Sequence, residues 1–250
     1  MNISGNTILI TGGGAGIGRG LAEALHGLGN QVVIAGRRKT VLDETIAANP
    51  GMKSATLNIE DPEAIKAFAA QIAQDYPSLN VVIHNAGIMR PEDLKSHNLA
   101  DAEAIITTNL LGPMRLNAAL LQLLLKQPHA TVITVSSGLA FVPLAHGPTY
   151  CATKAAIHSW TQSLRHQLKD TNIEVLEIIP PYVQTELGGQ AQATDPRAMP
   201  LKDFIGETMD ILKTQPTPPE IAVERVEFLT RAAELGRYGE AFTTLNSRTF

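Results

Sequence analysis

Short apolar runs alternate along the chain with longer segments in which apolar residues recur every three or four positions. The short runs are rich in Val and Ile and almost continuously apolar, which is typical of parallel strands covered on both faces. The longer segments have the spacing of an amphipathic helix. Strands are predicted at 7–11, 31–35, 54–58, 79–85, 130–136 and 173–179, and helices at 16–28, 38–48, 61–75, 99–126 and 148–170.

Repeated β-then-α units with short connections predict right-handed crossovers and one parallel sheet. The expected fold class is therefore α/β: a single-domain, Rossmann-type, doubly wound parallel sheet with helices on both faces, spanning residues 1–250. No linker rich in Pro or Gly divides the chain in two. At the third helix, Asp61 and Pro62 have the pattern of an N-cap followed by proline at the first helical position.

The regular pattern is interrupted over 180–219, which is rich in Pro, Gly and Thr and has one short helical piece around 201–212. An insertion of this size after a strand is typical of a functional lid or a mobile segment, and we expect residues 186–219 to form a substrate-binding lid or loop. Residues 220–236 predict a helix that ends at Gly236. The tail, 237–250, predicts no clear seventh strand.

The composition narrows the class of protein. With 44% hydrophobic and 18% charged residues the chain is typical of a soluble globular protein, and its net charge of −4 gives no footprint for nucleic acid or an anionic membrane. The single cysteine, Cys151, excludes an intramolecular disulfide and favours a reducing compartment. The first residues lack a signal-peptide pattern, and the richest apolar run, 116–126, is too short to cross a bilayer. We therefore expect a cytoplasmic protein that binds neither nucleic acid nor membrane.

A glycine-rich turn, "TGGGAGIGRG" at 11–20, follows the first strand and opens the first helix. Gly12, Gly16 and Gly18 are its spaced glycines. A backbone that turns sharply and approaches a pyrophosphate closely cannot carry a Cβ at such points, and the phosphates then meet the free N–H groups at the helix N-terminus. A plain tight turn is the alternative. The flanking strand and helix favour a dinucleotide-binding site.

The end of the second strand indicates which dinucleotide is bound. An acidic residue there suits the ribose 2′-hydroxyl of NAD, whereas arginine suits the 2′-phosphate of NADP. This chain has "GRRK", with Arg37 and Arg38 and no acid until Asp43. A guanidinium forms charge-assisted hydrogen bonds with a phosphate. NADP(H) is therefore favoured and NAD(H) is possible, the alternative being a solvated basic start to a helix.

Tyr150 and Lys154 lie four residues apart in a predicted helix, so they share one face. A tyrosine has an ordinary pKa of about 10, and a nearby ammonium stabilises its phenolate. The spacing therefore suits a tuned proton donor. Taken alone, it is equally typical of a tyrosine with a solvated lysine nearby.

These motifs occur in one order: "TGGGAGIG" (11–18), "HNAG" (84–87), Asn109 in "TTNLLG", "VSSG" (135–138) and "YCATK" (150–154). Together they resemble the short-chain dehydrogenase/reductase family over essentially the whole chain, and within it the branch labelled DltE. The resemblance implies a catalytic tetrad. Tyr150 would be the general acid/base, Lys154 would tune it and hold the nicotinamide ribose, Ser137 would hydrogen-bond the substrate oxygen, and Asn109 would kink its helix and hold a relay water.

The resemblance also implies binding residues. Residues 1–90 would form most of the dinucleotide-binding half, and the substrate, a hydrophobic or bulky carbonyl or alcohol, would meet Ser137, Tyr150, Met89 and Leu144. The implied cofactor contacts are Gly12, Gly14, Gly16, Ile17, Gly18, Arg37, Arg38, Asn58, Ile59, Asn85, Ala86, Gly87, Tyr150, Lys154, Pro180, Val183 and Thr185.

Some positions depart from the family pattern. His84 replaces an asparagine and is expected to be a strand-end residue with a satisfied hydrogen bond. Asn58 stands where an aspartate usually contacts adenine, and Pro181 where glycine is usual, which makes the carboxamide contact of Thr185 less secure. We expect no metal site, because no acid or Cys cluster accompanies the scattered histidines, among them His158.

The helices at 99–126 and 148–170 are apolar over much of their circumference and need more cover than one sheet face provides. A homodimer or homotetramer is therefore expected, as is common for the family. The favoured function is an NADP-dependent oxidoreductase that reduces a ketone or aldehyde reversibly to an alcohol. The alternatives are an NAD-dependent alcohol dehydrogenase and, from another class, a non-catalytic dinucleotide-sensing regulator. The intact Tyr, Lys and Ser disfavour the regulator.

Overall fold

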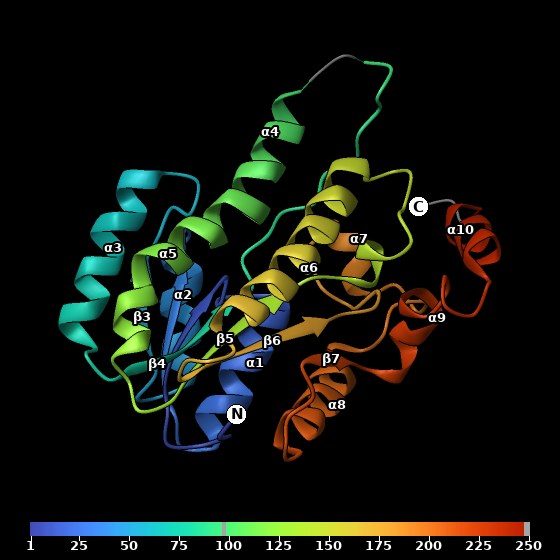
Figure 1. Cartoon of the computed structure of the whole chain (residues 1–250). Coiled ribbons are helices and arrows are strands. Elements are labelled where there is room, and N and C mark those ends of the chain that lie inside the picture. The colour runs from blue at the N-terminus through green and yellow to red at the C-terminus, as the bar shows by residue number, and fades with distance from the viewer. Residues whose placement is uncertain (97–98, 248–250) are drawn as a thin grey trace.

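The computed structural model describes residues 1–96 and 99–247. Within these residues, seven parallel strands form one sheet in the order β3-β2-β1-β4-β5-β6-β7. This arrangement confirms the predicted doubly wound α/β fold (Figure 1). The strands are β1 (Thr7–Thr11), β2 (Gln31–Gly36), β3 (Lys53–Thr56), β4 (Leu79–His84), β5 (Ala130–Val135), β6 (Ile173–Ile179) and β7 (Glu220–Ala222).

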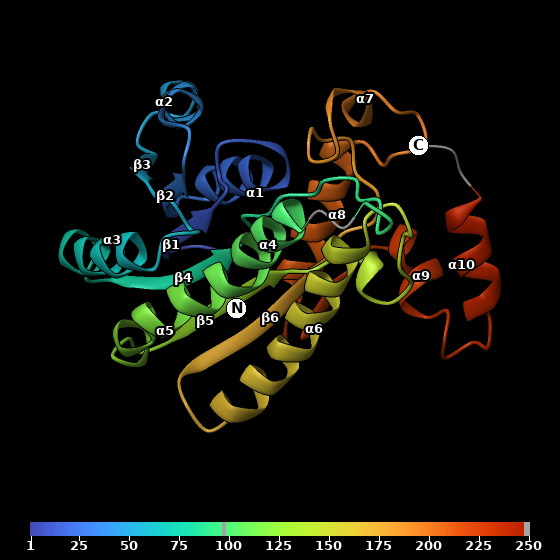
Figure 2. The same cartoon turned by 90° about the horizontal axis from the view of Figure 1, so that it is seen from above.

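Helices cover both faces of the sheet (Figure 2). Helices α1 (Gly16–Gly27), α2 (Lys39–Ala48) and α8 (Leu201–Lys213) pack on one face through a core that includes Leu21, Leu42 and Phe204. Helices α3 (Pro62–Asp75), α5 (Gly112–Leu125) and α6 (Pro148–Leu168) pack on the other through residues such as Phe68, Leu116 and Leu168. Because the central strands are buried on both faces, most of their residues are apolar.

The strand order reverses at β1, which pairs with β2 on one side and with β4 on the other. In a doubly wound sheet the crossover connections then leave in opposite directions and open a crevice at the carboxyl ends of the strands. The glycine-rich turn after β1 and the "HNAG" segment that begins with the last residue of β4 both lie at this edge. The topology therefore brings together two motifs that are about 70 residues apart in sequence.

Two predicted helices differ from the structure. The segment 99–126 is interrupted: α4 (Ala100–Ile106) is followed by a π-helical turn at Thr107–Leu111 and then by α5. The helix predicted over 220–236 is wrong for most of its length: residues 220–222 pair with β6 as strand β7, with Glu177 opposite Glu220, and turns replace the helix over 231–236. A 3₁₀ turn at Glu224–Val226 and the short α9 (Glu227–Thr230) lie between them. A seventh strand therefore exists, upstream of the tail.

The tail and the insertion have their own elements. The tail contains α10 (Tyr238–Asn246), and its residues 248–250 lie outside the described residues. In the insertion, α7 (Gln190–Ala193) precedes α8, which confirms the helical piece predicted around 201–212. A parallel bridge between Val183 and Met199 closes the segment on itself. Among the described residues no helix is both long and apolar enough to cross a membrane.

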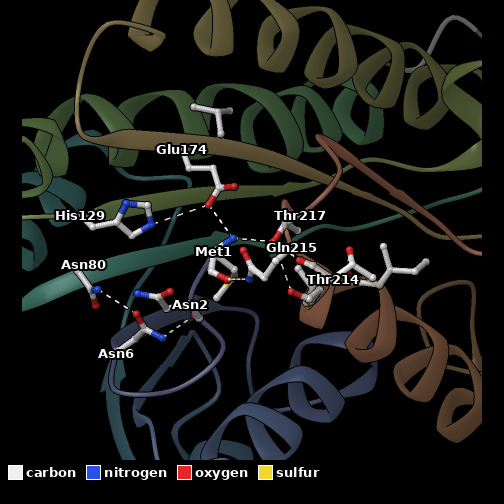
Figure 3. A network of polar contacts seen from close by, with 12 residues as sticks. Met1, Asn2, Asn6, Asn80, His129, Glu174, Thr214, Gln215 and Thr217 are labelled. Carbon is white, nitrogen blue, oxygen red and sulfur yellow. Dashed lines mark hydrogen bonds and ion pairs between the residues drawn. The ribbon is translucent and has the colours of Figure 1, made fainter.

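A polar network fastens the opposite edge of the sheet, where the strands begin (Figure 3). The Met1 amino group lies 2.6 Å from Thr217 Oγ1, just after α8, and 2.8 Å from a carboxylate oxygen of Glu174 in β6. Asn80 at the start of β4 donates to Asn6 Oδ1. These contacts join the first and last parts of the sheet away from the crevice.

Candidate active site

A cleft of about 590 Å³ lies at the carboxyl ends of the strands. Its lining includes the glycine-rich turn, the start of α6 and the first residues of the insertion. Most residues that the sequence singled out line it: Gly12, Gly14, Gly16, Ile17, Gly18, Arg37, Arg38, Ile59, Asn85, Ala86, Gly87, Met89, Ser137, Tyr150, Lys154, Pro180, Val183 and Thr185.

The glycine-rich turn is locked by the strand next to it. Gly12 has a φ of +68°, and a Cβ on Gly18 would lie 2.3 Å from Asn85 Nδ2 and from Gly12 O. The Asn85 amide occupies this space by donating to Thr11 O at 2.9 Å and to Gly12 O at 3.3 Å. Helix α1 then begins without a side-chain cap, at N-cap residue Ala15. Its first amides are therefore available to an anion at the positive end of the helix dipole.

The two arginines after β2 differ in their contacts. Arg37 Nη1 donates to Glu60 Oε1 at 2.6 Å, and the same carboxylate oxygen accepts from Thr108 Oγ1 at 2.9 Å. Arg38 lines the cleft and forms no ion pair with any residue in the described part of the chain. Glu60 was not identified from the sequence, because only the fold places it beside Arg37.

Helix α6 places Tyr150 and Lys154 side by side. Both side chains are buried, and Lys154 Nζ lies 5.5 Å from the centre of the Tyr150 ring. The ammonium donates to the backbone carbonyl of Val135, at the end of β5, at 2.7 Å. The i, i+4 spacing therefore has the geometric consequence that the sequence predicted.

Burial dominates the titration of this pair. It raises the pKa of the Tyr150 phenol well above its ordinary value, and hydrogen bonding with Ser137 lowers that pKa in part. Burial also lowers the pKa of Lys154 to about 8, and the negative charge of Glu177 raises it in part. We expected Lys154 to lower the pKa of Tyr150. In the protein without cofactor the Tyr150 pKa is raised instead, because desolvation of the phenol outweighs the charges around it.

Asn109 lies in the π-helical turn, as the kink implied by the resemblance requires. Its Oδ1 accepts from Ile88 N at 2.8 Å, and its Nδ2 donates to Ile88 O at 2.9 Å and to Thr153 Oγ1 at 3.2 Å. Asn109 itself does not line the cleft. Its side chain instead connects Ile88, the residue after Gly87, to Thr153 of α6.

Two expected cleft residues, Asn58 and Leu144, lie outside the cleft, and His84, at the end of β4 as expected, lacks its expected hydrogen bond. Asn58 is exposed beside the cleft, and its Oδ1 accepts from Glu60 N at 3.3 Å. Leu144 is buried in a core cluster with Tyr150 and Cys151 and does not line the cleft. His84 is buried, and neither ring nitrogen has a well-aligned hydrogen bond to the described residues, although Asn117 is a polar neighbour. Burial lowers the His84 pKa to about 4 and keeps the ring neutral.

The expectation that no acid accompanies His158 is wrong. The sheet brings Glu177 of β6 and Glu220 of β7 beside it, and atoms of the three side chains lie within 4.8 Å of one another. His158 Nδ1 lies 2.9 Å from Glu177 Oε2. Residues on separate strands give no local signal, so sequence spacing could not reveal this group.

The insertion, which the sequence predicted as a lid only in outline, contributes three cleft residues that were not named individually. Glu186, Leu187 and Gln192 line the cleft. Gln192 Nε2 donates to Val183 O at 2.8 Å and to Thr185 Oγ1 at 3.2 Å, which fixes α7 against the residues after β6. A glutamine in an irregular segment carries no pattern that would have identified it.

Comparison with known proteins agrees with this geometry. The short chain dehydrogenase family matches residues 6–196. An uncharacterized oxidoreductase of Bacillus subtilis (strain 168), DltE, is 39% identical over 254 residues, covering 99% of each chain.

Two solved structures share the fold. A short chain dehydrogenase from Burkholderia cenocepacia J2315 in complex with NADP has a TM-score of 0.82 at 23% identity, over 98% of both chains. A short chain dehydrogenase/reductase from Burkholderia phymatum in complex with NAD has a TM-score of 0.80 at 19% identity, over 95% of this chain and 97% of that one. With its family match, its full-length relative and a cleft built from the same motifs, the chain belongs to the short-chain dehydrogenase family, in its DltE-like branch, and is an NAD(P)-dependent oxidoreductase.

Proposed function

We propose that the protein reduces a ketone or aldehyde reversibly to an alcohol, with NADP(H) as the preferred cofactor and Tyr150 as the general acid/base. The observation that carries this proposal is that Ser137, Tyr150 and Lys154 line the same cleft as the uncapped glycine-rich turn. A buried phenol, an ammonium and a hydroxyl facing one cleft supply what carbonyl reduction requires of a protein.

The residues divide the work by their chemistry. A bound nicotinamide supplies the hydride and, when oxidised, a positive charge. Tyr150 gives its proton to the carbonyl oxygen in reduction and takes it back in oxidation, while Ser137 hydrogen-bonds that oxygen as its charge develops. The ammonium of Lys154, 5.5 Å from the phenol ring, stabilises the phenolate left behind. Desolvation strengthens each of these interactions.

The proposed preference for NADP(H) is supported by the two cations at the end of β2. Arg38 lines the cleft without an ion-pair partner in the described residues, so it is available to a 2′-phosphate. Arg37 faces the same end but is engaged by Glu60. This engagement favours NAD(H) as a second candidate cofactor, since one of the two arginines is already paired.

The proposed substrate is a hydrophobic or bulky carbonyl compound. Met89 and Leu187 provide apolar surface in the cleft, and residues 186–219 would form a lid that excludes water from the reacting atoms. A cytoplasmic location is proposed from the single, buried cysteine.

The test is a panel of aldehydes and ketones in which loss of NADPH is followed, repeated with NADH. In Tyr150→Phe the rate is expected to fall by about 10²–10⁴-fold, because the proton donor is lost while the ring remains. Tyr238→Phe is the matched control, since Tyr238 is 43% exposed on α10, away from the cleft. Equal turnover by the Tyr150 variant and its parent would refute the mechanism.

A further inference from the structure

Helix α6 carries a third polar residue on the face that presents Tyr150 and Lys154. His158 follows Lys154 by four positions, so the three side chains form one stripe along the helix. His158 Nδ1 lies 3.0 Å and 2.9 Å from the two carboxylate oxygens of Glu177 in β6. The Glu177 side chain is 0% exposed. A carboxylate withdrawn from water in this way is costly unless positive charge faces it.

The sheet places this carboxylate next to the attachment point of Lys154. Lys154 Nζ donates to the carbonyl of Val135, and the preceding residue of β5, Thr134, pairs with Glu177 across the β5–β6 ladder. The ammonium and the carboxylate therefore lie over neighbouring positions of the same two strands, beneath one helix. They interact electrostatically, and this interaction favours the charged form of Lys154.

Positive charge around Glu177 comes from α6, and a second negative charge comes from β7. His158 and Lys154 interact with Glu177, and Glu220 and Arg165 both act on His158. Arg165 is anchored by hydrogen bonds to the carbonyls of Val175 and Pro219. The basic side chains that face Glu177 therefore come from α6, Lys154 and His158, while Glu220 adds a second carboxylate beside His158.

Lys154 needs this support because its burial favours the neutral amine. With a pKa of about 8, it would lose its proton as the pH rises through the mildly alkaline range. Loss of the ammonium would remove the charge that stabilises the phenolate and would weaken the donation to Val135.

We propose that Glu177 is a positioning residue of this active site, whose buried carboxylate, oriented by His158, holds Lys154 in its ammonium form. The catalytic consequence rests on the proposed function, in which Lys154 acts on Tyr150. The charge relation itself rests only on the contacts of β5, β6 and α6.

The first measurement needs no substrate. The rate at which acetic anhydride acetylates Lys154, which lines the cleft, is followed against pH by peptide mass spectrometry. The variant Glu177→Gln replaces the carboxylate with a neutral group of the same shape. The midpoint of the pH dependence of Lys154 acetylation is expected to fall by about one pH unit, because removal of a negative charge disfavours the ammonium. Near pH 8 the protonated fraction would then fall about fivefold. Glu177→Asp keeps the charge and should stay near the parent midpoint.

The variant His158→Gln changes the α6 residue that contacts Glu177, and the same acetylation midpoint is measured in it. It removes a group that partly neutralises Glu177, so the Lys154 midpoint should equal the parent value or lie above it. A lower midpoint would overturn the proposal, and so would an unchanged midpoint in a folded Glu177→Gln. If Glu177→Gln does not fold, a raised Lys154 midpoint in His158→Gln would support the proposal, and a lowered one would overturn it. A midpoint that moves on adding Zn²⁺ to the parent would replace the proposal with a metal site.

The second measurement separates this inference from the proposed function. With a carbonyl substrate, the rate of reduction should fall with rising pH as Lys154 loses its proton, and this limb should lie at lower pH in Glu177→Gln. A purely structural role would lower the rate equally at every pH. If acetylation shifts as expected and no variant reduces any carbonyl, the proposed function fails and the charge relation stands.

Discussion

Gly18 and Asn85 show how single residues shape the crevice. From the sequence, Gly18 is expected to let the backbone approach a pyrophosphate closely. The structure identifies the neighbours as the Asn85 amide and Gly12 O, each 2.3 Å from where a Cβ would lie. Asn85 in turn closes the turn through its bonds to the carbonyls of Thr11 and Gly12. Each of the two motifs therefore depends on the other, and sequence alone shows only that both exist.

Residue-scale prediction succeeded where chemistry follows from local spacing and was incomplete where partners come from distant strands. Tyr150 and Lys154 were expected to share a face, and they do. Glu60 beside Arg37 and Glu177 beside His158 were not expected, because each partner comes from a separate segment of the fold. Leu144 has an apolar side chain suited to a pocket, but the packing of the fold places it in the core.

The cofactor preference can be tested at Arg38. Arg38→Ala is expected to weaken NADPH binding by about ten- to hundredfold, the effect of losing a hydrogen bond to a charged group, and to leave NADH binding nearly unchanged. Lys39→Ala is the matched control, because Lys39 is the next cation, pairs with Asp43 and does not line the cleft. Titration of both cofactors by protein fluorescence measures the affinities. Equal losses for NADPH and NADH would contradict the role of Arg38.

At the scale of elements, hydrophobic spacing found the helices but not their interruptions. Apolar residues continue with helical spacing through 99–126, yet the chain widens into a π-helical turn at Thr107–Leu111, where Asn109 bonds to the backbone of Ile88. Such turns are frequent at functional sites. The segment 220–222 is short and also fits a helix pattern. It becomes a strand because it pairs with the edge of β6. Tertiary pairing overrides local propensity in such short segments.

The start of α3 offers a test of an element that the sequence did specify. Asp61 caps the helix, since its carboxylate accepts from Glu63 N at 2.9 Å and from Ala64 N at 3.2 Å. Asp61→Ala is expected to lower the free energy of unfolding by about 1 kcal/mol. In contrast, Asp75→Ala at the last residue of α3 removes an acid from the negative end of the helix dipole and should cost less. Urea denaturation compares them, and equal losses would exclude the capping explanation.

At the scale of the whole molecule, the doubly wound topology decides where the chemistry lies. Apolar strands and right-handed crossovers could be predicted from the sequence, and they imply a crevice at the carboxyl edge. The position of the insertion could be predicted from the sequence, but its conformation could not, because its path depends on contacts such as those of Gln192 with Val183 and Thr185. The polar network around Met1 and Glu174 joins the chain at the opposite edge of the sheet (Figure 3).

The residues on the outer faces of α5 and α6 are relevant to the predicted homo-oligomer. Helix α5 leaves Leu121, Leu123 and Leu125 half-buried, whereas the exposed residues in the first half of α6 are small, Ala152, Ala155 and Ser159, and those beyond them are polar. The premise of a largely apolar circumference therefore holds better for α5 than for α6. Small residues still allow a second helix to approach closely, so the predicted homodimer or homotetramer stands as a prediction.

Sedimentation equilibrium at micromolar concentration should show a dimer or a tetramer. Ala155→Glu places a charge in the middle of the small-residue face of α6 and is expected to shift the protein toward monomer, because a buried, unpaired carboxylate opposes association. Gln167→Glu, at an exposed position near the end of the same helix, should leave the mass unchanged. A parent protein that sediments only as monomer would contradict the prediction. A dimer that persists in Ala155→Glu would place the interface elsewhere on the molecule.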